Sequence, residues 1–188
     1  MCIRDRDIRY LAELVEQVQK GDSDAFAELY ASTYKRQYQL AYSYLKDEYL
    51  AQDAMQETFI LVLKNIGQLR DPGLFIAWIN QINFRVCYSM QKKKKRMDSE
   101  INAVGEGDIE IIASDSPTPE DEVVRVDENN YVVSQLLKLP FTESQCIILK
   151  YYQNKTLDEI AYLMNISRST VKRYIKKGLA RLNEVMKQ

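Results

Sequence analysis

The stretch from Thr156 to Leu182 constrains the fold of this chain more than any other, because its pattern is that of two helices joined by a tight turn. Thr156 and Glu159 fit a capping box, which predicts that a helix begins at Thr156. Asn165 stands where the chain must turn, and asparagine tolerates a left-handed backbone. Ser167 is a good N-cap for the second helix. The stretch therefore predicts a helix-turn-helix.

The two predicted helices differ in what their faces carry. Each has an apolar side at helical spacing: Leu157, Ile160, Ala161 and Met164 in the first, and Val171, Ile175, Leu179 and Leu182 in the second. The other faces of the second helix begin with short polar side chains and continue with basic ones. This suits a helix whose first turns read base edges while its flanks hold phosphates.

The candidate DNA contacts on this second helix are Arg168, Ser169, Thr170, Lys172, Arg173 and Lys176. A basic helix that is merely solvated, in an ordinary bundle, is the alternative interpretation. The joint spacing of the small Ala161, the turn residue Asn165 and the anchoring Val171 favours DNA binding, because helices that cross closely need a small residue at the crossing.

The composition argues against catalysis and membrane insertion. Histidine is absent, which removes the commonest metal ligand and general base. Cys2, Cys87 and Cys146 are isolated and odd in number, so they form no metal or disulfide framework. No apolar run approaches a transmembrane helix or a signal-peptide core. We expect a cytoplasmic protein that is not an enzyme and needs no cofactor or metal.

Charge is segregated along the chain although the net charge is only −1. Eleven acidic residues and one basic residue lie between Asp98 and Asn130, so the rest of the chain is net positive. Two basic blocks therefore flank an acidic connector. This distribution, rather than the overall charge, is what matters for binding a nucleic acid.

Helical spacing of apolar residues dominates from Ile8 to about Met97, and no strand pattern competes. Residues 98–119 hold two glycines, two prolines and scattered acids, which is typical of a flexible linker. Helical pattern resumes near Glu120, and residues 142–145 fit a second capping box.

The expected fold is all-α. It has two small helical domains, residues 8–97 and 120–188, joined by a flexible acidic linker at 98–119. Residues 1–6 look unlike the pattern that follows and resemble translated adapter sequence, so they are given no functional weight.

Two blocks of motifs carry a resemblance to a known family. The first block comprises Gly21–Tyr30 (GDSDAFAELY), Asp53–Phe59 (DAMQETF) and Phe75–Ile79 (FIAWI), followed by a basic run. The second block runs from Leu139 (LPFTESQ) to Leu182. In these motifs, and in their order and separation, the chain resembles an extracytoplasmic-function sigma factor of bacterial RNA polymerase. This is a minimal branch of the sigma-70 family that has regions 2 and 4 and lacks region 3.

The resemblance implies a docking surface for core RNA polymerase. Asp53, Gln56 and Glu57 fall on one helical face, and in the family this face docks on the clamp helices of the largest polymerase subunit. Ile60 extends the surface, and an exposed isoleucine is easier to explain by a partner than by solvation. An ordinary solvated face is the alternative.

The resemblance also implies that the two regions contact different promoter elements. The helix from Ser167 would read the −35 element, while the Gln68–Leu74 loop and the following helix would engage the −10 element as it opens. The candidate −10 contacts are Asn80, Asn83, Arg85, Tyr88, Lys92, Lys93, Lys94, Lys95 and Arg96. Trp78 could stack on an unpaired base, but its place among apolar residues favours the core.

The implied function is to direct core RNA polymerase to specific promoters and to assist promoter opening, with the polymerase supplying the catalysis. A stand-alone helix-turn-helix regulator is the alternative, and the absence of a recognisable effector domain argues against it. Family members are commonly held inactive by an anti-sigma factor, and no residue here identifies one. Asn165 stands where the family usually has glycine, which should cost little.

Overall fold

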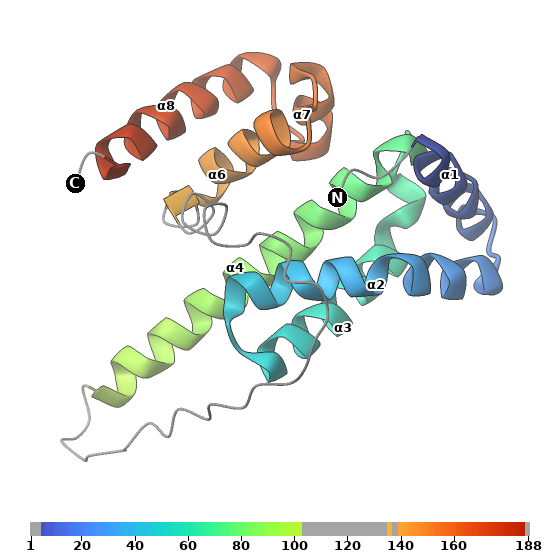
Figure 1. The fold of residues 1–188 in the computed structure, drawn as a ribbon, viewed down its shortest axis with the longest axis horizontal. Coiled ribbons are helices and arrows are strands. Elements are labelled where there is room, and N and C mark those ends of the chain that lie inside the picture. Colours follow the sequence, from blue (N-terminus) through green and yellow to red (C-terminus); the bar gives the residue numbers. More distant parts are fainter. Residues whose placement is uncertain (1–4, 103–134, 137–138, 187–188) are drawn as a thin grey trace.

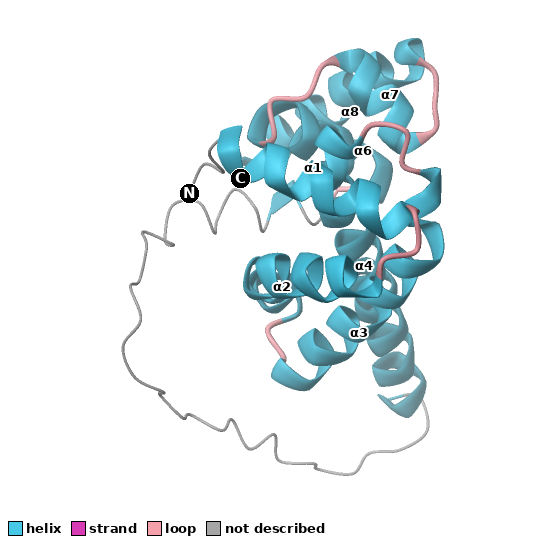
Figure 2. Cartoon of the chain, turned by 90° about the vertical axis from the view of Figure 1, so that its right-hand side faces the viewer, coloured by secondary structure: helices cyan, strands magenta, loops and turns pink. Residues whose placement is uncertain are grey.

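The computed structural model describes residues 5–102, 135–136 and 139–186, and the regular elements in these ranges are helices, with no strand among them. The elements of the N-terminal half are α1 (Asp5–Gln19), α2 (Ser23–Leu45), α3 (Glu48–Asn65), the 3-10 turns Ile66–Gln68 and Pro72–Leu74, and α4 (Phe75–Asn102). Those of the C-terminal half are α6 (Phe141–Ile147), the π-helical turn Ile148–Tyr152, α7 (Leu157–Met164) and α8 (Arg168–Met186) (Figures 1 and 2). The all-α prediction is confirmed.

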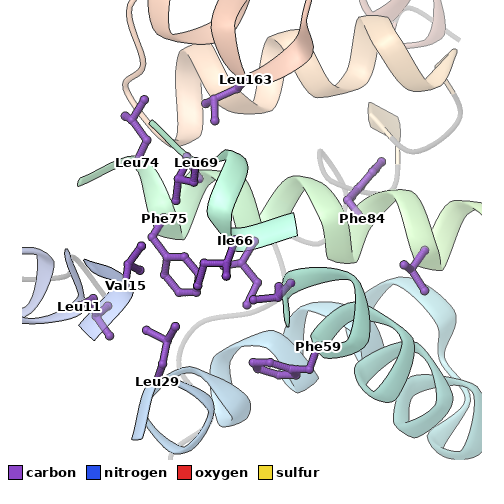
Figure 3. Packing of buried hydrophobic residues seen from close by; sticks show 14 of the residues in the cluster. Leu11, Val15, Leu29, Phe59, Ile66, Leu69, Leu74, Phe75, Phe84 and Leu163 are labelled. Carbon is purple, nitrogen blue, oxygen red and sulfur yellow. The ribbon is translucent and has the colours of Figure 1, made fainter. Parts of the chain in front are cut away.

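The N-terminal domain is a bundle in which α1 to α4 share one core (Figure 3). Its buried residues include Leu11, Val15, Leu29, Phe59 and Phe75. Each fully buried side chain of this size contributes roughly 1.5–3 kcal/mol, so the core rather than any cap stabilises the domain. The face of α3 opposite Asp53, Gln56 and Glu57 is buried, and Trp78 is half-buried against the core as predicted.

Aspartate side chains cap two of these helices. Asp22 accepts hydrogen bonds from the backbone N–H groups of Asp24 and Ala25 at the start of α2. Asp47 accepts one from the N–H of Leu50 at the start of α3. Such caps are worth about 1 kcal/mol each, and here they fix where the chain folds back.

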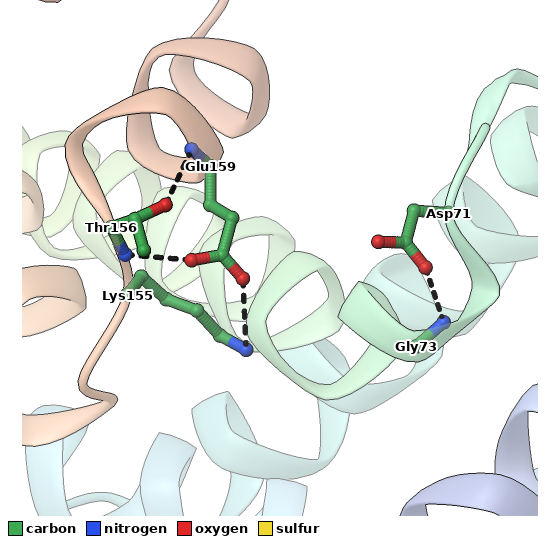
Figure 4. Close-up of polar contacts among 5 residues, drawn as sticks. All are labelled: Asp71, Gly73, Lys155, Thr156 and Glu159. Atoms are coloured by element: carbon green, nitrogen blue, oxygen red, sulfur yellow. Dashed lines mark hydrogen bonds and ion pairs between the residues drawn. The ribbon is translucent and has the colours of Figure 1, made fainter.

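The C-terminal domain contains the predicted helix-turn-helix. The Thr156 side chain accepts from the Glu159 N–H at 3.2 Å, and the Thr156 N–H donates to the Glu159 carboxylate at 2.6 Å, so the capping box is confirmed (Figure 4). Asn165 has φ 52° and ψ 49°, the left-handed turn that was predicted. The Ser167 hydroxyl accepts from the Thr170 N–H at 3.2 Å and caps α8.

Helices α6 and α8 cross closely at Gly178. A β-carbon there would lie 2.7 Å from Ile147 Cδ1 and 3.2 Å from Glu143 Cβ, so the crossing needs glycine. One turn further along, Arg181 donates to the Glu143 carboxylate at 2.9 Å. The Glu143 side chain is buried, and this ion pair satisfies it.

The predicted capping box at residues 142–145 is wrong. Helix α6 begins at Phe141, with Pro140 in the N-cap position and no side-chain cap bond. The Pro140 carbonyl already accepts from the N–H groups of Glu143 and Ser144, so the helix starts directly after the proline. Leu179 was placed on the apolar side of the second helix of the helix-turn-helix, but it is exposed.

Helix α4 is longer than predicted. It continues to Asn102, past the domain boundary expected at residue 97, because the lysine-rich run is itself a good helix former. The rest of the predicted linker, residues 103–119, and the helical pattern near Glu120 lie outside the described residues.

Candidate nucleic-acid interface

One side of α8 forms an exposed basic strip, and the opposite side anchors the helix. Arg168, Ser169, Lys172, Arg173 and Lys176 are exposed, as predicted, and Thr170 is half-buried. Val171 is fully buried on the other side. The anchor, the left-handed turn before α8 and its serine cap together hold the strip in a fixed orientation.

Several side chains of the strip already have partners within the domain. The Ser167 hydroxyl lies 2.9 Å from those of both Ser169 and Thr170. An Arg168 nitrogen lies 3.4 Å from the Asp158 carboxylate, but both groups are exposed, so this pair is weak and exchangeable. The guanidinium carbon of Arg173 lies 5.5 Å from the ring centroid of Tyr174, which supports that side chain from one face.

The C-terminal part of α4 carries the second basic cluster. Lys92, Lys93, Lys94 and Arg96 are exposed, and the Lys95 side chain lies outside the described set. Lys94 Nζ is 3.1 Å from an Asp47 oxygen, so this lysine ties α4 to the cap of α3. The hydrogen bond from the Leu50 backbone, followed by that from Lys94, lowers the pKa of Asp47.

Two of the predicted −10 contacts are not on the surface. Asn83 is fully buried, donating to the Gln37 carbonyl and side-chain oxygen at 2.8 and 2.9 Å. The Gln37 side chain donates in turn to the Asn80 oxygen at 2.6 Å, and Asn80 is buried too. The prediction that Asn80 and Asn83 contact DNA is therefore corrected: their amides join α2 to α4 inside the core.

Arg85 and Tyr88, the next two candidates on α4, contact the other domain. The Tyr88 ring lies 5.4 Å from that of Phe141, at the start of α6. The guanidinium carbon of Arg85 lies 5.7 Å from the same ring centroid. Arg85 is exposed and Tyr88 is half-buried, so both remain surface residues of α4.

The Gln68–Leu74 loop is fixed at both ends and exposed in the middle. Leu69 and Leu74 are buried, while Gln68, Arg70, Asp71 and Gly73 are exposed. The Asp71 carboxylate accepts from the Gly73 N–H at 2.9 Å and caps the short turn that follows (Figure 4). Polar groups and backbone are thereby held outward at the start of α4.

The predicted polymerase-docking residues share one exposed face of α3. Asp53, Gln56 and Glu57 are exposed, and Ile60 is 52% exposed. Leu63, 55% exposed, extends this surface by one turn. Sequence reasoning missed Leu63, although its spacing from Ile60 was a usable signal.

Neither a metal site nor a reactive thiol emerges from the described residues. They contain no cluster of three potential His, Cys, Asp or Glu ligands. Burial raises the pKa of Cys87 to about 12 and that of Cys146 to about 11, so both thiols stay protonated at neutral pH. None of the described helices combines the length and apolar character that a bilayer crossing requires.

Two family models match this chain. Residues 29–97 match sigma-70 region 2, and residues 136–184 match sigma-70, region 4. The chain is also 33% identical to the ECF RNA polymerase sigma factor SigW of Bacillus subtilis, over 92% of this chain and 95% of the relative. It belongs to the extracytoplasmic-function branch of the sigma-70 family.

Solved structures with the same fold include two protein complexes. CnrH in complex with the cytosolic domain of CnrY matches with a TM-score of 0.57 and 20% identity, covering 95% of this chain and 97% of that chain. The sigma factor RpoE in complex with the anti-sigma factor NepR, from Bartonella quintana, matches with a TM-score of 0.53 and 17% identity, covering 86% and 96%. The present sigma factor acts with core RNA polymerase and directs it to promoters. The matches to both sigma regions and to SigW favour this function over that of a stand-alone regulator.

Proposed function

We propose that this sigma factor divides promoter recognition between its two domains, residues 8–97 and 120–188. The observation that carries the proposal is the exposed basic strip of α8, opposite the buried Val171. The strip would enter the major groove of the −35 element, where arginine reads guanine with two hydrogen bonds and lysine holds phosphate. Arg168, Ser169, Thr170, Lys172 and Arg173 would lie toward the bases, with Lys176 on a phosphate.

The −10 element would be engaged by the N-terminal domain. The exposed backbone of the Gln68–Leu74 loop would receive the opening strand, while Arg85 and Tyr88 contact it along α4. The basic cluster of Lys92–Lys95 and Arg96 would hold its phosphates. Asn80 and Asn83 would support α4 from within rather than touch DNA.

The exposed face of α3 would dock on core polymerase. Ile60 and Leu63 supply apolar area, and Asp53, Gln56 and Glu57 surround it with polar groups. This is the usual composition of a protein interface, an apolar centre with a polar rim. In this proposal the protein acts in the cytoplasm and has no catalytic chemistry of its own. Like the RpoE relative, it would also bind an anti-sigma factor.

The docking surface is tested with a double substitution. Gln56→Ala with Glu57→Ala should weaken binding to core polymerase in a fluorescence titration without loss of helicity. The matched control is Glu16→Ala with Gln17→Ala, the same residue types in exposed positions on α1. Equal affinity of the two double variants for core polymerase would contradict the assignment of this face of α3 as the docking surface.

The division of promoter recognition is tested by footprinting the holoenzyme on a promoter that it transcribes. Arg173→Ala should cost roughly 1–3 kcal/mol of −35 binding and relax base preference there, whereas Lys176→Ala should reduce the salt slope by about one phosphate contact. If upstream protection survives deletion of residues 139–188, α8 does not read the −35 element.

A further inference from the structure

One side chain of α1 holds the backbone at the entry to the Gln68–Leu74 loop. The Gln19 amide nitrogen donates to the carbonyl oxygens of Ile66 at 2.8 Å and of Leu69 at 2.9 Å. Both acceptors are carbonyls, so only the NH2 end of the amide, which carries two hydrogens, can bond to them together. Gln19 therefore joins two backbone groups that lie 47 and 50 residues further along the chain.

The two carbonyls belong to the 3-10 turn Ile66–Gln68 and to its C-cap residue, Leu69. The Leu69 N–H closes the turn on the Ile66 carbonyl at 3.1 Å, and both of these side chains are buried. Leu69 has φ −75° and ψ 102°, an extended backbone that leads directly into the exposed residues of the loop. Because the side chain and the carbonyl of Leu69 are both held, the point at which the loop leaves the domain is fixed.

The backbone at Gln19 is itself held in place. Gln19 is the last residue of α1, and the chain turns at Gly21, which has φ 94° and donates its N–H to the Val18 carbonyl at 2.9 Å. Helix α1 packs against both 3-10 turns that flank the loop, and Val15 lies in the same core as Phe75 (Figure 3). The donor is thus anchored by the end of its own helix and by the core of the domain.

The far end of the loop has separate contacts. The Asp71 carboxylate accepts from the Gly73 N–H at 2.9 Å, and the Asp71 carbonyl accepts from the Leu74 N–H at 3.0 Å. With the Gln19 contacts at the near end, the exposed residues between are supported from both sides. A strand that binds there meets a backbone that is already ordered, which lowers the entropic cost of binding.

Core packing does not explain the contacts of Gln19, because this residue is exposed. It also lies outside residues 29–97, which match sigma-70 region 2. Helix α1 therefore gives that region a support that comes from outside it.

We propose that Gln19 is a positioning residue for −10 recognition, which holds the Gln68–Leu74 loop in the conformation that receives the opening strand. The proposal rests on the proposed assignment of the −10 element to the N-terminal domain. It adds that α1 takes part in promoter opening through one amide, which acts on the loop rather than on DNA.

Gln19→Met tests the role, because it removes both donors and keeps the length of the side chain. Gln17→Met, at another exposed position of α1, is the matched control. The probe is a fluorescent single-stranded oligonucleotide that carries the −10 element of a footprinted promoter. Holoenzyme with Gln19→Met should bind it roughly 3- to 30-fold more weakly, the weight of one to two ordinary hydrogen bonds, with unchanged affinity of the sigma factor for core polymerase. Equal binding by the two variants, or a parallel loss of core affinity, would overturn the proposal.

Gln19→Glu separates hydrogen-bond donation from shape. Glutamate has the shape of glutamine, but its carboxylate cannot donate and would place negative oxygens against two carbonyl oxygens. Gln19→Glu should therefore bind the oligonucleotide more weakly than Gln19→Met does, and more weakly than Gln17→Glu, which adds the same charge two residues away. A role in shape alone gives the opposite order of the two Gln19 variants, and that order would overturn the proposal.

Hydrogen exchange in the free protein tests the contact apart from the −10 assignment. The Leu69 N–H, which closes the turn, should exchange roughly 3- to 10-fold faster in Gln19→Met than in Gln17→Met. Equal exchange would overturn the positioning role. Failure of the −10 assignment itself is distinguishable, because wild-type holoenzyme would then bind the −10 oligonucleotide no better than a scrambled one; that result would overturn both, whatever the exchange of Leu69.

Discussion

The N-terminal domain is stabilised by a shared core and buried amides, whereas the C-terminal domain depends more on helix caps, a left-handed turn and a glycine at a helix crossing. In the first, α2 and α4 are joined by the Gln37, Asn80 and Asn83 side chains inside the bundle. In the second, a capping box, a left-handed asparagine and the Gly178 crossing position α8. The difference teaches that long-range contacts stabilise the N-terminal domain, while single residues fix the helix positions in the C-terminal domain.

Gly178→Val should produce the largest effect and confine it to the C-terminal domain. The new side chain would press on Ile147 and Glu143, and overpacking of this kind costs about 3 kcal/mol of unfolding free energy. Denaturant unfolding followed by hydrogen exchange should show α6 and α8 opening first. Ala180→Val, an exposed position on the same helix, is the matched control. Equal loss from both variants would mean that the crossing is not tight.

Asn83→Ala should destabilise the N-terminal domain by about 2 kcal/mol. The substitution removes the Asn83 donor from the buried Gln37 side-chain oxygen, and an unsatisfied buried polar group costs roughly 1–3 kcal/mol. Gln39→Ala, exposed on α2, should change stability little. Hydrogen exchange should locate the loss in α2 and α4. A loss of −10 protection with unchanged stability would contradict the structural role.

Thr156→Ala should cost about 1 kcal/mol, because it removes the oxygen that caps α7. Thr142→Ala should cost much less, since the start of α6 has no side-chain cap. Thermal unfolding of the two variants compares them directly. A larger effect at residue 142 would restore the second capping box and contradict the structure.

Asn165→Gly should have the smallest effect, within about 0.5 kcal/mol. Asparagine already tolerates the left-handed conformation, and the relief that glycine brings there is offset by its greater freedom in the unfolded chain. Denaturant unfolding measures the change. A stabilisation well above 1 kcal/mol would show that the turn is strained.

The same contrast explains what the sequence could predict. The helix-turn-helix was accessible because capping boxes, turn residues and apolar spacing are local signals, and Thr156, Asn165 and Val171 lie where they indicate. The family motifs located the exposed face of α3. Asn80 and Asn83 were misplaced because a polar residue on an amphipathic helix gives no local sign that a glutamine on another helix will satisfy it.

The interface between the domains could not be predicted from the sequence either, because a local pattern gives no sign of a partner that lies far away in the chain. Tyr162 bonds to backbone groups about ninety residues earlier in the chain. Its spacing within α7 marks it as an ordinary exposed tyrosine. The wrong prediction of a second capping box had a different origin: α6 begins at Phe141, two residues before the start that an N-cap at Thr142 would give, because the Pro140 carbonyl already accepts the first helical hydrogen bonds.

Run-off transcription tests the central claim, that this sigma factor recognises promoters with two separate domains, most directly. Core polymerase with and without the protein would transcribe fragmented genomic DNA from the source organism, and the 5′ ends would be sequenced. We expect new start sites that share two upstream motifs, and Arg173→Ala should weaken the use of the distal motif only. New starts that share a single motif, or no starts beyond those of core polymerase alone, would contradict it.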